Sequence, residues 1–490
     1  MTNPSITTVN DSLAHKASKS VFWTVFSNMG VSIINFGTTM VMARLLSPTD
    51  FGLLGMATLV TGTLGLLGNI SWNAAILQKQ DCVEDHLSTA HWAYILTGII
   101  LTLIGIASAP FAAHFFREPS LQSIIVCLSF NFIIEKLAHI RPLLLVRALQ
   151  FKTLAIIEVA TGIVRGVTIL IFAFMGWAVW SIVWGMLIER ITKAILFVSY
   201  VKWRPQWIFN KAKLRELFDF GKNIYGESLV DYLNTNIAFI LTGRLLGATT
   251  LGFYNFAFNI PHLVLTHVSE GVSSVVYPLY CQMQNDIGRV ARGYLKTTQY
   301  ISLVTFPALA GLFFVAYDFV HLVYGAKWLS VIVPLKILCI SGALLSITKT
   351  NGLLCAAIGK PQMSFRWKLM QFPFALMAVA FGSHWGIVGV AWAMAFMAIV
   401  SLIFIRCGVH LVGTSFRQYL YILWPATGSS FLMLCVMFAI NELFYFRDLL
   451  MWLRFSFNVL LGASLYILFM RFIFQEVFHD FLGFIRKMFQ

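Results

Sequence analysis

The sequence is dominated by apolar stretches of about 20 residues, the length that crosses a bilayer core as a helix. These stretches lack the roughly ten-residue alternation of polar and apolar residues that an outer-membrane β-barrel shows. The sequence therefore predicts an all-α integral membrane protein with about 14 transmembrane helices. The predicted spans are 20–43, 51–72, 89–112, 120–139, 153–175, 177–200, 223–243, 252–278, 297–317, 328–348, 367–383, 385–406, 418–440 and 452–472.

The distribution of charge predicts how these helices are oriented. Lys16 and Lys19 precede the first span, which has no small-residue cleavage site, so we expect an uncleaved first helix. With both termini in the cytoplasm, most of the 35 lysines and arginines fall in cytoplasmic segments, as the positive-inside rule requires. The net charge of +15 then reflects loops that face anionic lipid, and we expect no nucleic-acid partner.

Cysteines and catalytic motifs give no sign of an enzyme. The seven cysteines are scattered through apolar runs without CxxC or zinc-ligand spacing, which predicts neither a metal site nor a cofactor. We find no nucleophile motif, no paired catalytic carboxylates and no Gly-rich phosphate loop for ATP.

A nine-residue motif occurs twice, 200 positions apart. The first motif is "RLLSPTDFG" from Arg44 to Gly52, and the second motif is "RLLGATTLG" from Arg244 to Gly252. Each motif ends one apolar helix and starts the next. Ser47 and Asp50 have the spacing of a capping box, with Pro48 at the first helical position.

In the second motif, we expect Gly247 to end a helix with a positive φ, and Thr249 or Thr250 to cap the next helix. Arg44 and Arg244 lie in the last turn of their helices. They either bind free carbonyls there and reach the outer surface, or act as gate and phosphate contacts.

The order of helices after each motif indicates an internal repeat. The fifth and sixth helices of each half are joined by a very short link, Gly176-Trp177 and Trp385-Gly386. Because each repeat has an even number of helices, both copies keep one orientation, and an axis along the membrane normal relates them. We expect an N-terminal six-helix lobe (1–200), a C-terminal six-helix lobe (201–412) and an extra helix pair (413–490).

Charged residues inside the spans are expensive in lipid and are therefore functional candidates. Glu158 and Arg165 lie seven residues apart on one helix face. They either pair with each other or line a wet cavity that holds substrate.

Two further sets of polar residues are candidates. Glu227, Asp231 and Asn234 form a stripe on the seventh span, and Lys336 stands inside the tenth, where an ammonium could meet a phosphate. Asp231 is either a cavity carboxylate or a hydrogen-bonded lobe contact. Charged clusters near helix ends either form salt bridges that close the inner surface or touch substrate, and Arg141 is also a gate candidate; the clusters comprise Glu135, Lys136 and Arg141, and Glu189, Arg190 and Lys193.

Several phrases resemble a known family. "ARLLSPTDFGLLGMA", "YLNTNIAFILTGRLLGATTLGFYNFAFNIP" (232–261), "VYGAKW" and "GTSFRQYLYILW" are similar to polysaccharide transporters of the Wzx flippase type, in particular the colanic acid exporter subgroup. This family belongs to the superfamily that also contains multidrug extruders and the lipid II flippase.

The resemblance implies two lobes around a central cavity and a location in the bacterial inner membrane. The implied substrate is an oligosaccharide linked to undecaprenyl pyrophosphate. Where relatives often carry Asp-x-Gly near the end of the second helix, this chain has Asn69-Ile70-Ser71, which puts any coupling role of that carboxylate in doubt.

The leading function is therefore a non-enzymatic carrier that works by alternating access, with H+ or Na+ as the coupling ion. Its further partners would be membrane lipids and the polymerase and glycosyltransferases of the same polysaccharide. One alternative is a cation-coupled multidrug extruder, and another is a membrane glycosyltransferase or polymerase. Enzymes of that kind usually carry catalytic residues on long outer loops, whereas the longest loop here, about 201–222, is predicted to be inside and basic.

Overall fold

The computed structural model describes residues 4–68, 84–284, 286–443 and 450–488, and these residues form helices joined by short turns. Fifteen α-helices and two short 3-10 helices lie in this described part of the chain, without a strand. The chain separates into two compact units. Unit 1 contains Met1–Tyr232 and Gly247–Gly252, and unit 2 contains Leu233–Leu246 and Phe253–Gln490. The division into lobes at residues 200 and 412 stays a prediction.

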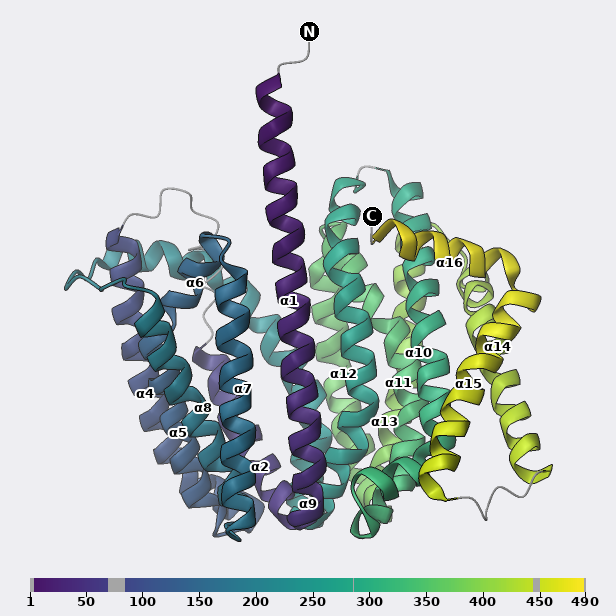
Figure 1. Cartoon of the computed structure of the whole chain (residues 1–490), viewed down its shortest axis with the longest axis horizontal. Coiled ribbons are helices and arrows are strands. Elements are labelled where there is room, and N and C mark those ends of the chain that lie inside the picture. Colours follow the sequence, from purple (N-terminus) through teal and green to yellow (C-terminus); the bar gives the residue numbers. More distant parts are fainter. Residues whose placement is uncertain (1–3, 69–83, 285, 444–449, 489–490) are drawn as a thin grey trace. The chain divides into compact units, whose positions relative to one another are not determined.

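Unit 1 is a bundle in which α4, α5, α7 and α8 run side by side (Figure 1), with α1 packed along α7. Its helices are α1 (Pro4–Leu45), α2 (Pro48–Gly68), α4 (Glu84–Phe116), α5 (Leu121–Ala138), α6 (Ile140–Arg147), α7 (Phe151–Phe174) and α8 (Val179–Tyr200), followed by the start of α9 (Lys211–Gln282).

Glycines allow α4 and α5 to approach closely. A methyl group on Gly105 would lie 2.2 Å from the Ser129 hydroxyl, and one on Gly98 would lie 3.1 Å from the Phe132 carbonyl oxygen. Small residues serve this purpose between membrane helices, where close van der Waals packing replaces the hydrophobic effect.

Unit 2 is a second helical bundle built on α10. Its helices after α9 are α10 (Ile287–Val323), η1 (Ala326–Val331), α11 (Ile332–Ala357), α12 (Pro361–Gly382), η2 (Ser383–Trp385), α13 (Gly386–Leu411), α14 (Phe416–Leu443), α15 (Met451–Ile473) and α16 (Gln475–Met488). The amphipathic α16 lies across the end of α10, where Phe481 and Phe484 contact the Tyr300 ring (Figure 1).

Eleven stretches of the described residues are long and apolar enough to span a membrane, which confirms the predicted class. Pro361–Leu411 contains two of the predicted spans, and Leu229–Ser269 overlaps with two others. Helix α8 is not among the eleven, because Glu189, Arg190 and Lys193 make its central part strongly charged. The predicted span positions otherwise match the observed helices within several residues.

The predicted connections between helices are confirmed. Ser47 and Asp50 form the capping box at the start of α2: the Ser47 amide donates to the Asp50 carboxylate (2.9 Å), and the Asp50 amide donates to the Ser47 hydroxyl (3.3 Å). The short links between α7 and α8 and between α12 and α13 contain Gly176 (φ 81°) and Gly386 (φ 66°), a backbone conformation that glycine adopts without a steric penalty.

The segment labelled α9 (Lys211–Gln282) consists of two helices, as the two predicted spans require. They meet in a bend at Gly247, where φ is 83° and ψ is 176° and the backbone is not helical. This conformation is essentially restricted to glycine, so the bend is set by the residue type. The positive φ expected at Gly247 is confirmed.

Candidate functional site

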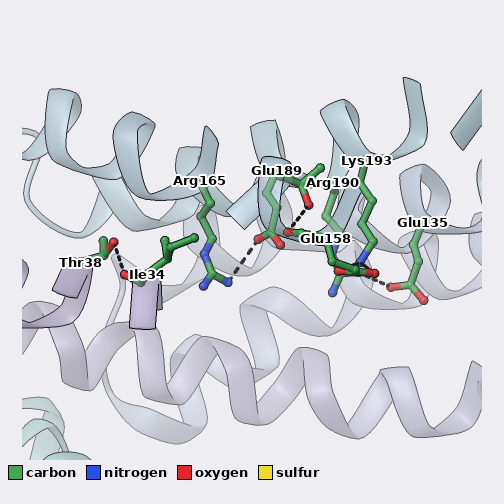
Figure 2. A network of polar contacts seen from close by, with 9 residues as sticks. Ile34, Thr38, Glu135, Glu158, Arg165, Glu189, Arg190 and Lys193 are labelled. Atoms are coloured by element: carbon green, nitrogen blue, oxygen red, sulfur yellow. Dashed lines mark hydrogen bonds and ion pairs between the residues drawn. The ribbon is translucent and has the colours of Figure 1, made fainter. Parts of the chain in front are cut away.

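The charged residues within unit 1 form an ion-pair network between α5, α7 and α8. Figure 2 shows these side chains in one row, with the guanidinium of Arg165 between Glu189 and the Ile34 and Thr38 residues of α1. The network comprises Glu135 of α5, Glu158 and Arg165 of α7, and Glu189, Arg190 and Lys193 of α8.

Helix α8 supplies one partner to every pair of the network. Arg165 Nη1 lies 3.3 Å from Glu189 Oε2, Lys193 Nζ lies 2.6 Å from Glu158 Oε1, and Arg190 Nη1 lies 3.3 Å from Glu135 Oε2. The three charges of α8 occur over five residues, somewhat more than one helical turn, so they point toward both neighbouring helices.

The network is partly buried rather than dry. The exposed fractions of the Arg165 and Glu189 side chains are 25% and 18%, and those of Lys193 and Glu158 are 24% and 30%. Charges in this intermediate setting keep access to water while attracting each other more strongly than in bulk solvent. The arrangement therefore suits groups that exchange partners.

Of the two arrangements predicted for Glu158 and Arg165, an ion pair with each other is not the one observed. Each of these residues is paired with α8 instead, Glu158 with Lys193 and Arg165 with Glu189. Seven residues along one helix correspond to about 10 Å of rise, whereas the charges of a packed neighbouring helix are closer. The salt bridges expected for Glu189, Arg190 and Lys193 are present.

A cavity of about 180 Å³, the Arg165 cavity, lies at one end of the network. It is lined by Asn35, Thr38, Thr39 and Met42 of α1, Phe51 and Leu54 of α2, Arg165 and Ile169 of α7, and Ile182 and Met186 of α8. The ion pair with Glu189 uses only Nη1 of Arg165. Guanidinium donors beyond that pair, beside the polar side chains of α1, can receive an anion or a sugar hydroxyl.

A second cavity of about 200 Å³, the Lys193 cavity, lies at the other end of the network. Its titratable lining consists of Glu135, His139, Glu158, Arg190 and Lys193, and Phe197 and Pro142 contribute apolar surface. Arg165 thus lines one cavity, and the other two ion pairs of the network line the second.

His139, directly after α5, is held neutral at the edge of the Lys193 cavity. Burial, and after it the charge of the Lys136 ammonium, lower the pKa of this imidazole to about 4 against the opposing effect of Glu135. Its Nδ1 lies 3.9 Å from Glu135 Oε1. At neutral pH the group is therefore an uncharged neighbour of the ion pairs.

Arg141 lies apart from the ion pairs and fixes the segment that follows α8. It is buried, its Nη1 donates to the Leu137 carbonyl (3.1 Å), and its Nη2 donates to the Trp203 carbonyl (3.3 Å). The Trp203 ring also lies under its guanidinium. These contacts support a structural role for Arg141.

The predicted polar stripe of the seventh span lies on α9. The side chain of Glu227 is outside the described residues, Asp231 is exposed, and Asn234 donates from Nδ2 to the Lys368 carbonyl at 2.9 Å. The segment Asn69–Asn73 is also outside the described residues.

The remaining predicted cations lie near helix ends. Lys336 lies close to the start of α11 and inside the candidate span Ala326–Ala357, as predicted, with Nζ 5.4 Å from the centre of the Phe313 ring. Arg44 lies in the last turn of α1, as predicted, and Arg244 lies three residues before the bend at Gly247.

Two sets of polar residues were missed in the sequence analysis. Asn35, Thr38 and Thr39 line the Arg165 cavity but look like ordinary small polar residues in an apolar run. Asp318 of α10 pairs with Arg454 of α15, whose Nε lies 3.0 Å from Asp318 Oδ2. The acidic residue inside an apolar stretch was the available signal for this second pair.

Comparison with solved structures shows which proteins have a similar fold. The fold is similar to that of the lipid II flippase MurJ in an inward closed conformation, with a TM-score of 0.73 at 16% identity over 93% of this chain and 99% of that one. It is also similar to an inward-facing multidrug resistance MATE family transporter, with a TM-score of 0.60 at 14% identity over 78% of this chain and 95% of that one. The chain is therefore an all-α membrane protein with the fold of these transporters.

The sequence then gives the family. The polysaccharide biosynthesis protein family matches residues 41–333, more than half of the chain, and this chain belongs to it. It is 29% identical to the teichuronic acid biosynthesis protein TuaB of Bacillus subtilis, over 78% of this chain and 80% of the relative. It is 25% identical to the lipopolysaccharide biosynthesis protein WzxC of Escherichia coli, over 84% and 85%. The succinoglycan biosynthesis transport protein ExoT of Rhizobium meliloti is 22% identical, over 86% and 82%.

Proposed function

We propose that this protein moves an oligosaccharide linked to undecaprenyl pyrophosphate across the bacterial inner membrane, for surface polysaccharide export. The carrier works by alternating access and performs no catalysis. The observation that carries the proposal is the ion-pair network of unit 1, which places exchangeable cations between two cavities.

The chemistry of the substrate fits this network. A diphosphate needs several charge-assisted donors, and a guanidinium provides them in a planar fork. When a phosphate oxygen binds Arg165, it competes with Glu189 for the same cation, so binding is reversible and the protein retains a partner for Arg165 after release. The neutral donors and acceptors of Asn35, Thr38 and Thr39 suit sugar hydroxyls.

The relatives support this substrate class. TuaB and WzxC are named for biosynthesis of two cell-surface polysaccharides, and ExoT is named as a transport protein of a third. Glycosyltransferases would supply the substrate and a polymerase would consume it. The driving ion is H+ or Na+, which can replace a cation partner at a carboxylate of the network. Glu227, Asp231, Asn234 and Lys336 keep their proposed role as cavity contacts, and Arg44 and Arg244 as gate residues.

We propose that both termini lie in the cytoplasm. The experiment uses intact cells with a permeable outer membrane that express a cysteine-free variant of the protein. In this variant, Ala326→Cys should react with an impermeant thiol reagent, and Asn210→Cys should not. The reverse pattern would overturn the orientation.

Export in cells tests the function. Deletion of the gene should leave lipid-linked oligosaccharide on the cytoplasmic side and remove the surface polysaccharide. Arg165→Ala should fail to restore export while accumulating in the membrane at the normal level. Arg289→Ala is the matched control, because it removes an exposed arginine whose ion pair is with Asp286 at the start of α10. Normal polysaccharide in the deletion strain, with greater sensitivity to dyes and drugs, would favour the multidrug extruder instead.

A further inference from the structure

The two copies of the repeated motif contact each other. Both contact segments, Pro48–Gly52 and Gly247–Gly252, belong to unit 1, although the parts of α9 on both sides of the second segment belong to unit 2. The Thr49 and Thr249 hydroxyls share a hydrogen bond of 2.8 Å. We call this contact of the two segments the motif contact.

The contact is reciprocal. A methyl group on Gly52 would lie 1.8 Å from the Ala248 carbonyl oxygen, and one on Gly252 would lie 1.9 Å from the Pro48 carbonyl oxygen. Residues 52 and 252, and residues 48 and 248, occupy equivalent places in the two motifs. Residue i of one copy meets residue j of the other and the reverse, which is the pattern of a local two-fold axis. Thr49 and Thr249, also equivalent, pair across that axis.

Only glycine is compatible with this approach of the two backbones. A side-chain carbon cannot lie within 2 Å of a carbonyl oxygen, so any larger residue at position 52 or 252 would push the helices apart. Close-packed contacts of this kind are either formed or separated, because packed surfaces do not deform continuously. The motif contact therefore has two states.

The contact is also built to be reversible. The hydrogen bond between Thr49 and Thr249 joins two neutral hydroxyls in an exposed position. The bend at Gly247 brings the second motif into place through its backbone alone, since a methyl group there would meet nothing within 4 Å.

We infer that the motif contact is a conformational lock, which holds the corner between α1 and α2 against the bend of α9 and separates when the carrier changes state. This role rests on the proposed alternating-access function. It explains why the sequence repeats this motif, since a self-complementary contact needs the same small residues in both copies.

Cysteine cross-linking tests the lock. In a cysteine-free background, Thr49→Cys with Thr249→Cys should form a disulfide on mild oxidation, and the oxidised protein should lose export that a reductant restores. Thr49→Cys with Thr250→Cys is the matched control, because residue 250 leaves the helix about 100° away from residue 249. Failure to cross-link would overturn the contact. Continued export by fully cross-linked protein would overturn the lock while leaving the function intact.

A second variant gives a readout that does not depend on export. Gly52→Ala in the Thr49→Cys, Thr249→Cys background should lower the cross-linking yield by about fivefold or more, because overpacking shifts the equilibrium toward separation. Gly65→Ala is the control, since its methyl group would lie 3.7 Å from Phe132 in ordinary contact. Equal yields in the two variants would contradict the lock. If the cross-linking yields are as expected but the wild-type protein does not export polysaccharide, the proposed function is rejected and the lock is kept.

Discussion

The two units bury polar side chains in different ways. Unit 1 uses charges that remain partly exposed beside two cavities, such as Arg165 with a side-chain exposure of 25%. Besides the Asp318–Arg454 ion pair, unit 2 has a cluster of neutral groups that are almost fully buried: Tyr294 and Asn351 are 0% exposed, and Tyr419 and Thr350 are 1% exposed.

The neutral groups of unit 2 bond to each other and to the backbone. The Thr298 and Thr350 hydroxyls lie 3.2 Å apart, Tyr419 donates to the Ile347 carbonyl (3.2 Å), and Asn351 donates to the Phe404 carbonyl (2.8 Å). Neutral hydrogen-bond networks of this kind specify helix packing. We propose that the charged network of unit 1 serves transport and that the neutral network of unit 2 serves structure.

The largest effect should come from removing one partner of the Lys193–Glu158 ion pair in unit 1. Lys193→Met alone leaves Glu158 without its cation, and we expect a loss of about 2 kcal/mol, less than the roughly 3–5 kcal/mol of a fully buried pair. Lys193→Met with Glu158→Leu should restore the melting temperature of the purified protein, because both charges are removed. It should not restore export. A double variant that exports normally would show that this pair is structural.

Overpacking the neutral network should affect stability alone. A methyl group on Gly408 would lie 1.6 Å from Asn351 Oδ1, so Gly408→Ala should destabilise unit 2 by about 2 kcal/mol. Gly352→Ala, whose methyl group would lie 3.8 Å from Ser364 Oγ, is the control and should not lower the melting temperature. Export per folded molecule should equal that of the wild type. If Gly408→Ala abolishes export at a normal protein level, the contrast between the units fails.

The smallest effect concerns pH. Because the pKa of His139 falls from 6.5 to about 4 on folding, the unfolded chain binds a proton between these values and the folded chain does not. Stability conferred by the neutral imidazole is complete above pH 6.5 and decreases as the pH falls toward 4, by about 1 kcal/mol per pH unit. Melting temperatures measured from pH 7 to 5 should fall less steeply for His139→Gln. Identical slopes would place His139 in a more hydrated setting.

The positions of the helices could be predicted because long apolar runs are visible in the sequence. The short helices were missed, although Val477, Phe478, Phe481 and Phe484 of α16 have helical spacing. That spacing indicates one apolar face, and polar and charged residues such as His479 and Asp480 make the segment unlike a span.

The sequence predicted residues of the candidate site but not their ion-pair partners. Charges within apolar runs identified Glu158 and Arg165, because such charges are costly in lipid. Their pairing with α8 depends on how three helices pack, and spacing along one chain segment carries no information about it. The capping box at Ser47 was predictable since its partners are three residues apart.

Direct binding tests the claim that the charged network of unit 1 is the substrate site. Purified protein in lipid nanodiscs would be titrated with undecaprenyl pyrophosphate, and Arg165→Ala compared with Tyr419→Phe. We predict that Arg165→Ala weakens binding by about tenfold or more, the value of a lost charge-assisted hydrogen bond, while Tyr419→Phe binds like the wild type. Wild-type affinity in Arg165→Ala would contradict this account.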